Sequence, residues 1–189
     1  MRLYEIKEAL ESSGRLVIDV KQLSVLIGIP RSHAKVYAAR LVSKKWAWKP
    51  RRGIIALTDD EFVLSTQLVE PSYISMHSAL YLHGIIDQVP VLVECVTTKQ
   101  SLNLSRIGIR YRKINPMLFF GYSRLDRQNS YIYVAVPEKA VLDMVYFGYQ
   151  PPEDIELDLT MLKNMMKSFS LLNSPRAKRV VRWVKKHVE

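Results

Sequence analysis

The chain has 189 residues, 48% of them hydrophobic, and carries 28 Lys or Arg against 18 Asp or Glu, a formal net charge of +10. This length forms one or two domains with a sizeable core, and the positive charge favours a polyanionic partner such as nucleic acid. The single cysteine, Cys95, excludes an intrachain disulfide and suits a cytoplasmic location. No apolar run reaches about 18 residues, so we expect neither a membrane span nor a membrane partner.

The positive charge is concentrated at the two ends of the chain. Residues 1–70 carry 12 basic and 8 acidic side chains, residues 71–160 carry 8 and 9, and residues 161–189 carry 8 and 1. A boundary near Glu70-Pro71 separates a DNA-binding domain with a linker helix, 1–70, from an α/β domain with basic C-terminal helices, 71–189. The predicted fold class is α+β.

The first elements in the chain have the pattern of a winged helix-turn-helix. An amphipathic helix ends at Ser13-Gly14, and residues 15–17 can form a short strand that pairs with the wing. Asp19 and Gln22 then form a capping-box start of a helix that Gly28 ends. Pro30 limits the turn, and a second helix is predicted from Arg31 to Lys45.

The second helix is amphipathic. On a helical wheel Ala34, Tyr37, Ala38 and Leu41 share the face that we expect to pack on the core. The opposite face holds small side chains, which can approach base edges, and its flanks hold basic ones, which can reach phosphates. The alternative is a surface helix with a solvated basic face.

A basic hairpin follows this helix, as in a wing. The side chains from Trp46 to Lys49 alternate in character, which is typical of a strand. Pro50 to Gly53 form a turn signal, and residues 54–57 are predicted to form the second strand of the hairpin. From Lys21 to Thr58 there are nine Lys or Arg and no Asp or Glu, the bias that phosphate contact requires. Trp46 and Trp48 suit packing of the wing better than base stacking. The predicted DNA-binding residues are Arg31, Ser32, His33, Lys35, Val36, Arg40, Lys44, Lys45, Lys49, Arg51 and Arg52.

The remaining elements alternate between helices and strands. A capping box at 58–61 opens a helix through Leu68, and Ser75 opens a short helix that Gly84 ends. Strands are predicted at 91–97, 107–114, 118–122 and 131–136, with a polar turn at 124–130. Pro137 begins a helix at 138–147. After a loop at 150–154, helices open at Thr160 and at Ser174-Pro175, and the last carries a basic face over 177–187.

Three features occur together in order: the winged helix, the stretch PSYISMHSALYLHGI at 71–85, and VPEKAVLDMVY at 136–146. Over roughly residues 5–150 the chain resembles the AbiEi family of antitoxin-type transcriptional regulators from type IV toxin–antitoxin (abortive-infection) systems. The resemblance implies a repressor that binds inverted repeats in its own promoter through the winged helix. It also implies an antitoxin domain that opposes a nucleotidyltransferase-type toxin without a tight complex. A stand-alone regulator without a toxin, or a protein-interaction antitoxin in which DNA binding is secondary, are the alternatives.

Candidate catalytic and metal-binding residues are few. Lys139 and Asp143, four apart on a helix, fit an ordinary surface ion pair better than part of a nuclease site, and Glu138 suits the helix N-terminus. His77 and His83 lie on different faces of their helix, and no zinc-ligand spacing includes Cys95. His83 beside Gly84 suits a helix C-terminus. We therefore expect no enzyme, no metal and no cofactor.

Two further basic surfaces are candidates for a second nucleic-acid or partner contact. The first surface lies on a predicted strand and can also be a solvated face. The second lies on the last predicted helix. That helix can contact DNA, bind RNA, or be a solvated helix that docks through its apolar side. The residues concerned are Arg110, Arg112, Lys178, Arg179, Arg182, Lys185 and Lys186. Whether the protein is a monomer or a dimer is left open by the sequence.

Overall fold

The computed structural model describes residues 2–188 and divides the chain into two compact units. Unit 1 holds the chain up to Glu70 together with Arg124–Ile132, and unit 2 holds Pro71–Ser123 with the remainder from Tyr133. The combination of helices with mixed sheets confirms the α+β class. The sequence placed residues 124–132 in the second domain, whereas the structure groups them with the first.

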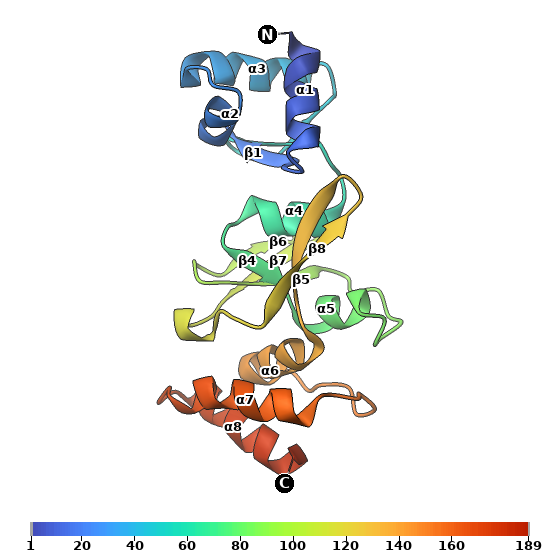
Figure 1. Cartoon of the computed structure of the whole chain (residues 1–189), viewed down its shortest axis with the longest axis vertical. Helices are drawn as coiled ribbons and strands as arrows, with labels where there is room; N and C mark the ends of the chain where they lie inside the picture. The colour runs from blue at the N-terminus through green and yellow to red at the C-terminus, as the bar shows by residue number, and fades with distance from the viewer. Residues whose placement is uncertain (1, 189) are drawn as a thin grey trace. The chain divides into compact units, whose positions relative to one another are not determined.

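Unit 1 begins with the order of elements of a winged helix-turn-helix (Figure 1). Helices α1 (Leu3–Ser12), α2 (Val20–Leu26) and α3 (Arg31–Ser43) accompany strands β1 (Val17–Asp19), β2 (Trp48–Arg51) and β3 (Ile54–Ala56). The strands form an antiparallel sheet in the order β1-β3-β2, so the chain before α2 pairs with the wing as predicted. The pairing strand begins at Val17, two residues later than the predicted strand at 15–17.

Local signals in the sequence set the boundaries of α2. The Asp19 carboxylate accepts a hydrogen bond from the backbone N–H of Gln22 (2.7 Å), and the Gln22 side chain accepts one from Asp19 N–H (2.9 Å), a complete capping box. Gly28 follows the helix with φ of 65°, a left-handed conformation that glycine adopts without strain. The tight link between α2 and α3 therefore follows from residues close in sequence.

The core of the winged unit lies under α3. Ala34, Ala38 and Leu41 are buried there and pack with Ile6 and Leu10 of α1. Tyr37, the fourth residue of the predicted stripe, is partly buried against the same cluster. This burial leaves the other side of α3 exposed.

Helix α4 (Glu61–Leu68) completes unit 1. Asp60 is its N-cap rather than Thr58: Asp60 Oδ1 accepts from Phe62 and Val63 N–H, while its Oδ2 accepts from Arg127 Nε (2.6 Å). Buried Gln67 accepts from Leu16 and Val17 N–H and donates to Ser130 Oγ (2.9 Å). These polar bonds join the segment 124–132 to α4.

The second sheet is mixed, with the order β6-β7-β5-β4-β9-β8, and most of it belongs to unit 2. Residues 124–127 of β8 and 130–132 of β9 are grouped with unit 1. The strands are β4 (Ser72–Ile74), β5 (Val93–Thr97), β6 (Leu102–Leu104), β7 (Ile109–Lys113), β8 (Tyr122–Arg127) and β9 (Ser130–Ala135). Strand β5 pairs antiparallel with β4 and parallel with β7. The sequence predicted neither β4 nor β6, which have three residues each.

Four helices pack in unit 2: α5 (Met76–Leu82), α6 (Pro137–Phe147), α7 (Leu159–Ser170) and α8 (Pro175–Val188). Helix α6 contacts α5 on one side and α8 on the other, and α7 pairs with α8 (Figure 1). Nine of the eleven α6 residues are buried, because α6 lies between these neighbours. Asp158 is the N-cap of α7, and its side chain accepts hydrogen bonds from the N–H groups of Thr160 and Met161.

One strand prediction and one turn prediction near residue 120 are wrong. The predicted strand at 118–122 is instead a 3₁₀ turn, η2 (Pro116–Leu118), followed by irregular chain. Asn115 caps that turn by accepting from Met117 N–H (2.9 Å), and Gly121 has φ of 72°, which an extended strand does not allow. The predicted polar turn at 124–130 is largely strand, and only Gln128 and Asn129 separate β8 from β9.

Candidate nucleic-acid interface

The outer face of α3 carries the residues predicted to read DNA. Arg31, Ser32, His33, Lys35, Val36 and Arg40 are all exposed, while their helical neighbours Ala34 and Ala38 are buried. Val36 is 49% exposed on this face. Such an exposed apolar side chain between basic ones suits contact with a thymine methyl group in a major groove.

The basic side chains continue from α3 into the wing. Lys44 caps the helix, Lys45 adopts a left-handed φ of 58°, and Gly53 forms the wing turn with φ of 82°. Lys49, Arg51 and Arg52 are exposed on β2 and its turn, as are Lys44 and Lys45. The structure therefore brings all eleven predicted residues onto the solvent-accessible side of α3 and β2.

None of the basic side chains at these positions forms an ion pair with a residue that the structure describes. The Arg40 guanidinium lies over the Tyr37 ring at 5.7 Å, which holds it by a cation–π contact without neutralising it. Unpaired lysines and arginines are available to phosphate oxygens. We call the eleven residues the α3–wing surface.

Trp46 and Trp48 lie at the edge of this surface. Each is 37% exposed, and Trp48 Nε1 donates to Thr58 O at 2.8 Å. Both line a groove of about 570 Å³ beside Lys45 and Lys49. The indole of Trp48 is thus fixed by the protein and half-buried, which fits the packing interpretation of the sequence better than a free stacking platform.

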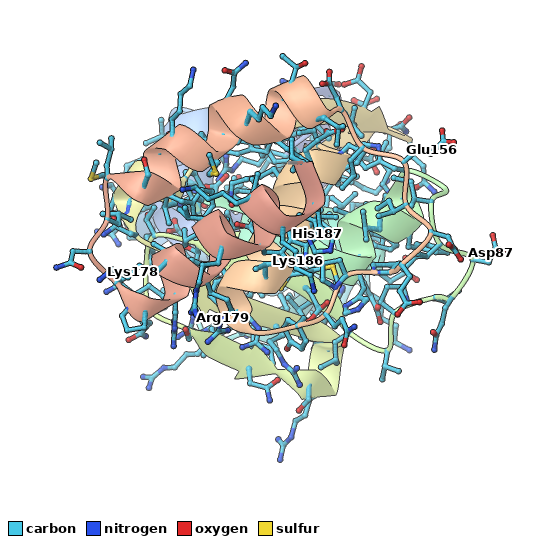
Figure 2. The ribbon with its side chains drawn as sticks, turned by 90° about the horizontal axis from the view of Figure 1, so that it is seen from below. Asp87, Glu156, Lys178, Arg179, Lys186 and His187 are labelled. Atoms are coloured by element: carbon cyan, nitrogen blue, oxygen red, sulfur yellow. The ribbon has the colours of Figure 1, made fainter. Side chains whose placement is uncertain are left out.

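The basic face of α8 is exposed at Lys178, Arg182, Lys185 and Lys186, and Ala177, Val180 and Val184 are buried beneath it. Figure 2 labels Lys178 and Lys186 on this helix. Arg179 has a structural contact: its Nη1 donates to Val145 O at 3.5 Å, near the end of α6. A side chain at Gly148 would meet that guanidinium at 2.7 Å. Arg179 is therefore less available to a partner than the other four.

The two arginines of β7 differ in their surroundings. Arg112 donates to the Tyr149 hydroxyl and lies over the Tyr149 and Phe147 rings at 4.9 and 5.5 Å. Arg110 forms no ion pair or side-chain hydrogen bond with any residue in the described range. Of these two predicted contact residues, only Arg110 has a guanidinium that is available to bind a ligand.

The Lys139–Asp143 pair is buried, so the prediction of a surface ion pair is wrong. Both side chains are 0% exposed. Lys139 donates to Asp143 Oδ1 and to Tyr73 OH (2.9 Å), and Asp143 Oδ2 accepts from Tyr73 OH (2.9 Å) and Ser75 Oγ (2.8 Å). Helical spacing alone cannot reveal this, because the covering groups come from β4 and α7.

The surroundings of this pair are aromatic. The Lys139 ammonium lies 5.4 Å from the ring centroids of Tyr73 and Phe120 and 5.8 Å from that of Phe169. Burial lowers the pKa of Lys139, an effect that Asp143 opposes, and burial followed by the Asp143 charge raises the pKa of Tyr73 well above 10.0. A group without exposed surface cannot reach a substrate, so the arrangement joins β4 to α6.

Glu138, next to Lys139 in α6, also has a structural role. It lies in the first turn of α6, as predicted, and its Oε1 accepts from the N–H of Asp158 at 2.9 Å. It therefore fixes the chain just before α7. The three residues of the nuclease hypothesis are buried parts of the unit 2 core.

The histidines of α5 have separate partners. His83 is the C-cap residue of α5, as predicted, and its Nε2 lies 2.9 Å from Ala135 O. His77 Nδ1 pairs with Glu94 Oε2 at 3.0 Å, and this hydrogen bond raises the pKa of His77 above 6.5. Sequence analysis missed this pair, although Glu94 is a charged residue within a predicted buried strand and could have drawn attention to it.

The Cys95 side chain is buried in the core. Within residues 2–188 no three His, Cys, Asp or Glu side chains come together as a metal site. No helix of this range combines the length and apolar character needed to cross a bilayer.

Comparison with known proteins finds no matching family model and no similar curated protein.

Proposed function

We propose that the protein is a sequence-specific DNA-binding transcriptional regulator. The observation that carries the proposal is the α3–wing surface, where eleven exposed residues include eight lysines and arginines without ion-pair partners in the described structure. Duplex DNA is a dense polyanion, and basic side chains on a helix and its following hairpin match its grooves and backbone.

In the proposed complex α3 enters a major groove. Ser32, His33, Lys35 and Val36 lie nearest the base edges, since they precede the helix centre on its outer face. Arg51 and Arg52 at the wing turn hold the adjacent backbone or minor groove. Inverted repeats would be bound by two copies, as a dimer or as two monomers.

The proposal includes autorepression and an antitoxin role in a type IV system, and a cytoplasmic location goes with both. Their support is the likeness of the 71–85 and 136–146 segments to the AbiEi family. No catalytic step is proposed: Glu138, Lys139 and Asp143 are all buried.

The direct test uses Lys35→Ala combined with Arg40→Ala, two exposed side chains of α3. Binding to duplex DNA from the gene's own upstream region should weaken by at least about tenfold. The matched control is Lys163→Ala with Lys167→Ala, which removes the same charge from exposed positions on α7. Equal loss in both variants, or none in the first, would contradict the assignment of α3.

The second candidate is that unit 2 acts on a toxin while DNA binding is secondary. Removing residues 1–70 is a poor test, because it removes Asp60 and Gln67, the partners of Arg127 and Ser130. The Lys35→Ala/Arg40→Ala variant avoids this problem. Co-expressed with a neighbouring nucleotidyltransferase toxin, it should still protect cells if the antitoxin activity belongs to unit 2; lost protection by a folded variant would argue against this candidate.

A further inference from the structure

A second feature of unit 2 is a pocket of about 380 Å³ beside the His77–Glu94 pair. One wall is the segment 86–92, where Val89 and Val91 are 63% and 93% exposed. The other end is polar and consists of His77, Glu94 and Arg110. The volume lies at the lower end of the range of about 300–1,000 Å³ for ligand pockets, so a ligand would be small.

The polar end contains an uncompensated cation. Glu94 and Arg110 are neighbours in register on the parallel strands β5 and β7, so their side chains share a face of the sheet. The Glu94 carboxylate nevertheless pairs with His77, and its side chain is 10% exposed. Arg110 has no ion pair among the described residues, although the residue is partly buried at the pocket.

The charged side chains around His77 have a net positive charge, which favours the binding of an anion. With His77 protonated, Glu94 balances it and Arg110 leaves one positive charge. Arg112, next on the same face of β7, is held by Tyr149, whose ring meets the His77 ring edge-on at 5.8 Å. Asp87 on the nearby loop is exposed and points away from the body of the unit (Figure 2).

We propose that this pocket binds a small organic anion, with its carboxylate or phosphate group on Arg110 and His77 and its apolar part against the segment 86–92. A guanidinium and an imidazolium form charge-assisted hydrogen bonds with such oxygens. The apolar wall adds a preference for a ligand with a hydrocarbon body over an inorganic ion. This binding activity goes beyond DNA recognition and does not depend on it.

The test is titration of the full-length protein at about pH 6, where His77 is protonated, followed by methyl NMR. The probes are hexanoate and hexyl phosphate, compared with hexanol, hexylammonium and inorganic phosphate. We expect saturable shifts of the Val89 and Val91 methyl signals with at least one organic anion. The tighter of the two anions identifies the head group, and both comparators without negative charge should bind at least about tenfold more weakly.

Variants give a second readout. Arg110→Gln should weaken the binding of the organic anion by about tenfold or more, while Arg106→Gln, an exposed arginine outside the pocket, should leave it unchanged. Hexanoate binding should also weaken as the pH rises and His77 becomes neutral.

Three results would overturn the proposal: no saturation by either organic anion, inorganic phosphate binding as tightly as both, or full affinity in a folded Arg110→Gln variant. The methyl shifts of the unmodified protein decide the question even if that variant does not fold.

Discussion

At the scale of single residues, Asp143 is a buried carboxylate on which three buried side chains of unit 2 converge. It accepts from Lys139, Tyr73 and Ser75, and none of these side chains has appreciable exposed surface. Removing one partner of a buried ion pair is costly, because the other charge is left without compensation or hydration.

Asp143→Asn should therefore destabilise the protein by about 3–5 kcal/mol, since Lys139 loses its counterion while the shape is kept. Chemical denaturation followed by circular dichroism measures this loss. The matched control is Asp154→Asn, an exposed carboxylate in the loop before α7, which should change the free energy of unfolding by less than about 0.5 kcal/mol. Similar curves for both variants would show that the buried pair is not a stabilising element.

His77 provides a pH-dependent contribution to stability. The Glu94 hydrogen bond raises its folded-state pKa above 6.5, so the folded state binds the proton more tightly than the unfolded state. The stabilisation is complete below pH 6.5 and is lost as the pH rises through the folded-state pKa.

NMR titration of the imidazole should accordingly give a midpoint above 6.5 for His77, and Glu94→Gln should lower it. Unfolding measured at about pH 5.5 and pH 8.5 should show a larger loss of stability in the native protein than in His77→Gln. His187→Gln, at an exposed position on α8, is the control. A midpoint at or below 6.5 would contradict the assigned pair.

Residue patterns predicted the winged unit better than the buried chemistry of unit 2. The face of α3 follows from the spacing of Ala34, Ala38 and Leu41, because helical periodicity is local. The burial of Lys139 depends on Tyr73 and Phe169, which are distant in sequence. An i, i+4 pair therefore looks the same in sequence whether it lies on the surface or in the core.

At the scale of elements, the wing is the part of unit 1 most easily tested. Arg51 and Arg52 are exposed at the turn between β2 and β3, and Gly53 allows that turn its positive φ. Within residues 2–188 neither side chain forms an ion pair, so their truncation should change DNA affinity without changing stability.

Arg51→Ala combined with Arg52→Ala should weaken binding to every duplex and reduce the slope of log affinity against log salt by about two. The reason is that each phosphate contact releases about one counterion. Fluorescence anisotropy across a salt series measures both quantities, and the Lys163→Ala/Lys167→Ala protein serves as the charge-matched comparison. An unchanged slope would mean that the hairpin is not a DNA-contacting wing.

The elements that were predicted least well are those whose partners are far away in sequence. Strands β4 and β6 have three residues each, too few for a period-two pattern to be recognised. The 124–130 segment is polar because it is the end of a hairpin, and its strands are held by Asp60 and Gln67 of α4. Polarity alone indicated a turn there.

At the scale of the whole molecule, the sequence led to two domains, and the chain divides into two compact units near residue 70. The boundary was visible because Pro71 follows a capped helix. The strand order β6-β7-β5-β4-β9-β8 was not predictable, since the pairing of β4 with β9 joins residues about sixty positions apart. Charge suggests the proposed function, because the basic residues of α3 and the wing are exposed and form no ion pair with any residue from 2 to 188.

The central claim is that the α3–wing surface recognises a particular DNA sequence. The measurement that tests it most directly is anisotropy of the protein with upstream duplex and with scrambled duplex, across a salt series. We predict that the upstream DNA binds at least about 1,000-fold more tightly than the scrambled DNA at physiological salt. Equal and steeply salt-dependent affinity for both duplexes would contradict the claim and reduce the surface to a general polyanion contact.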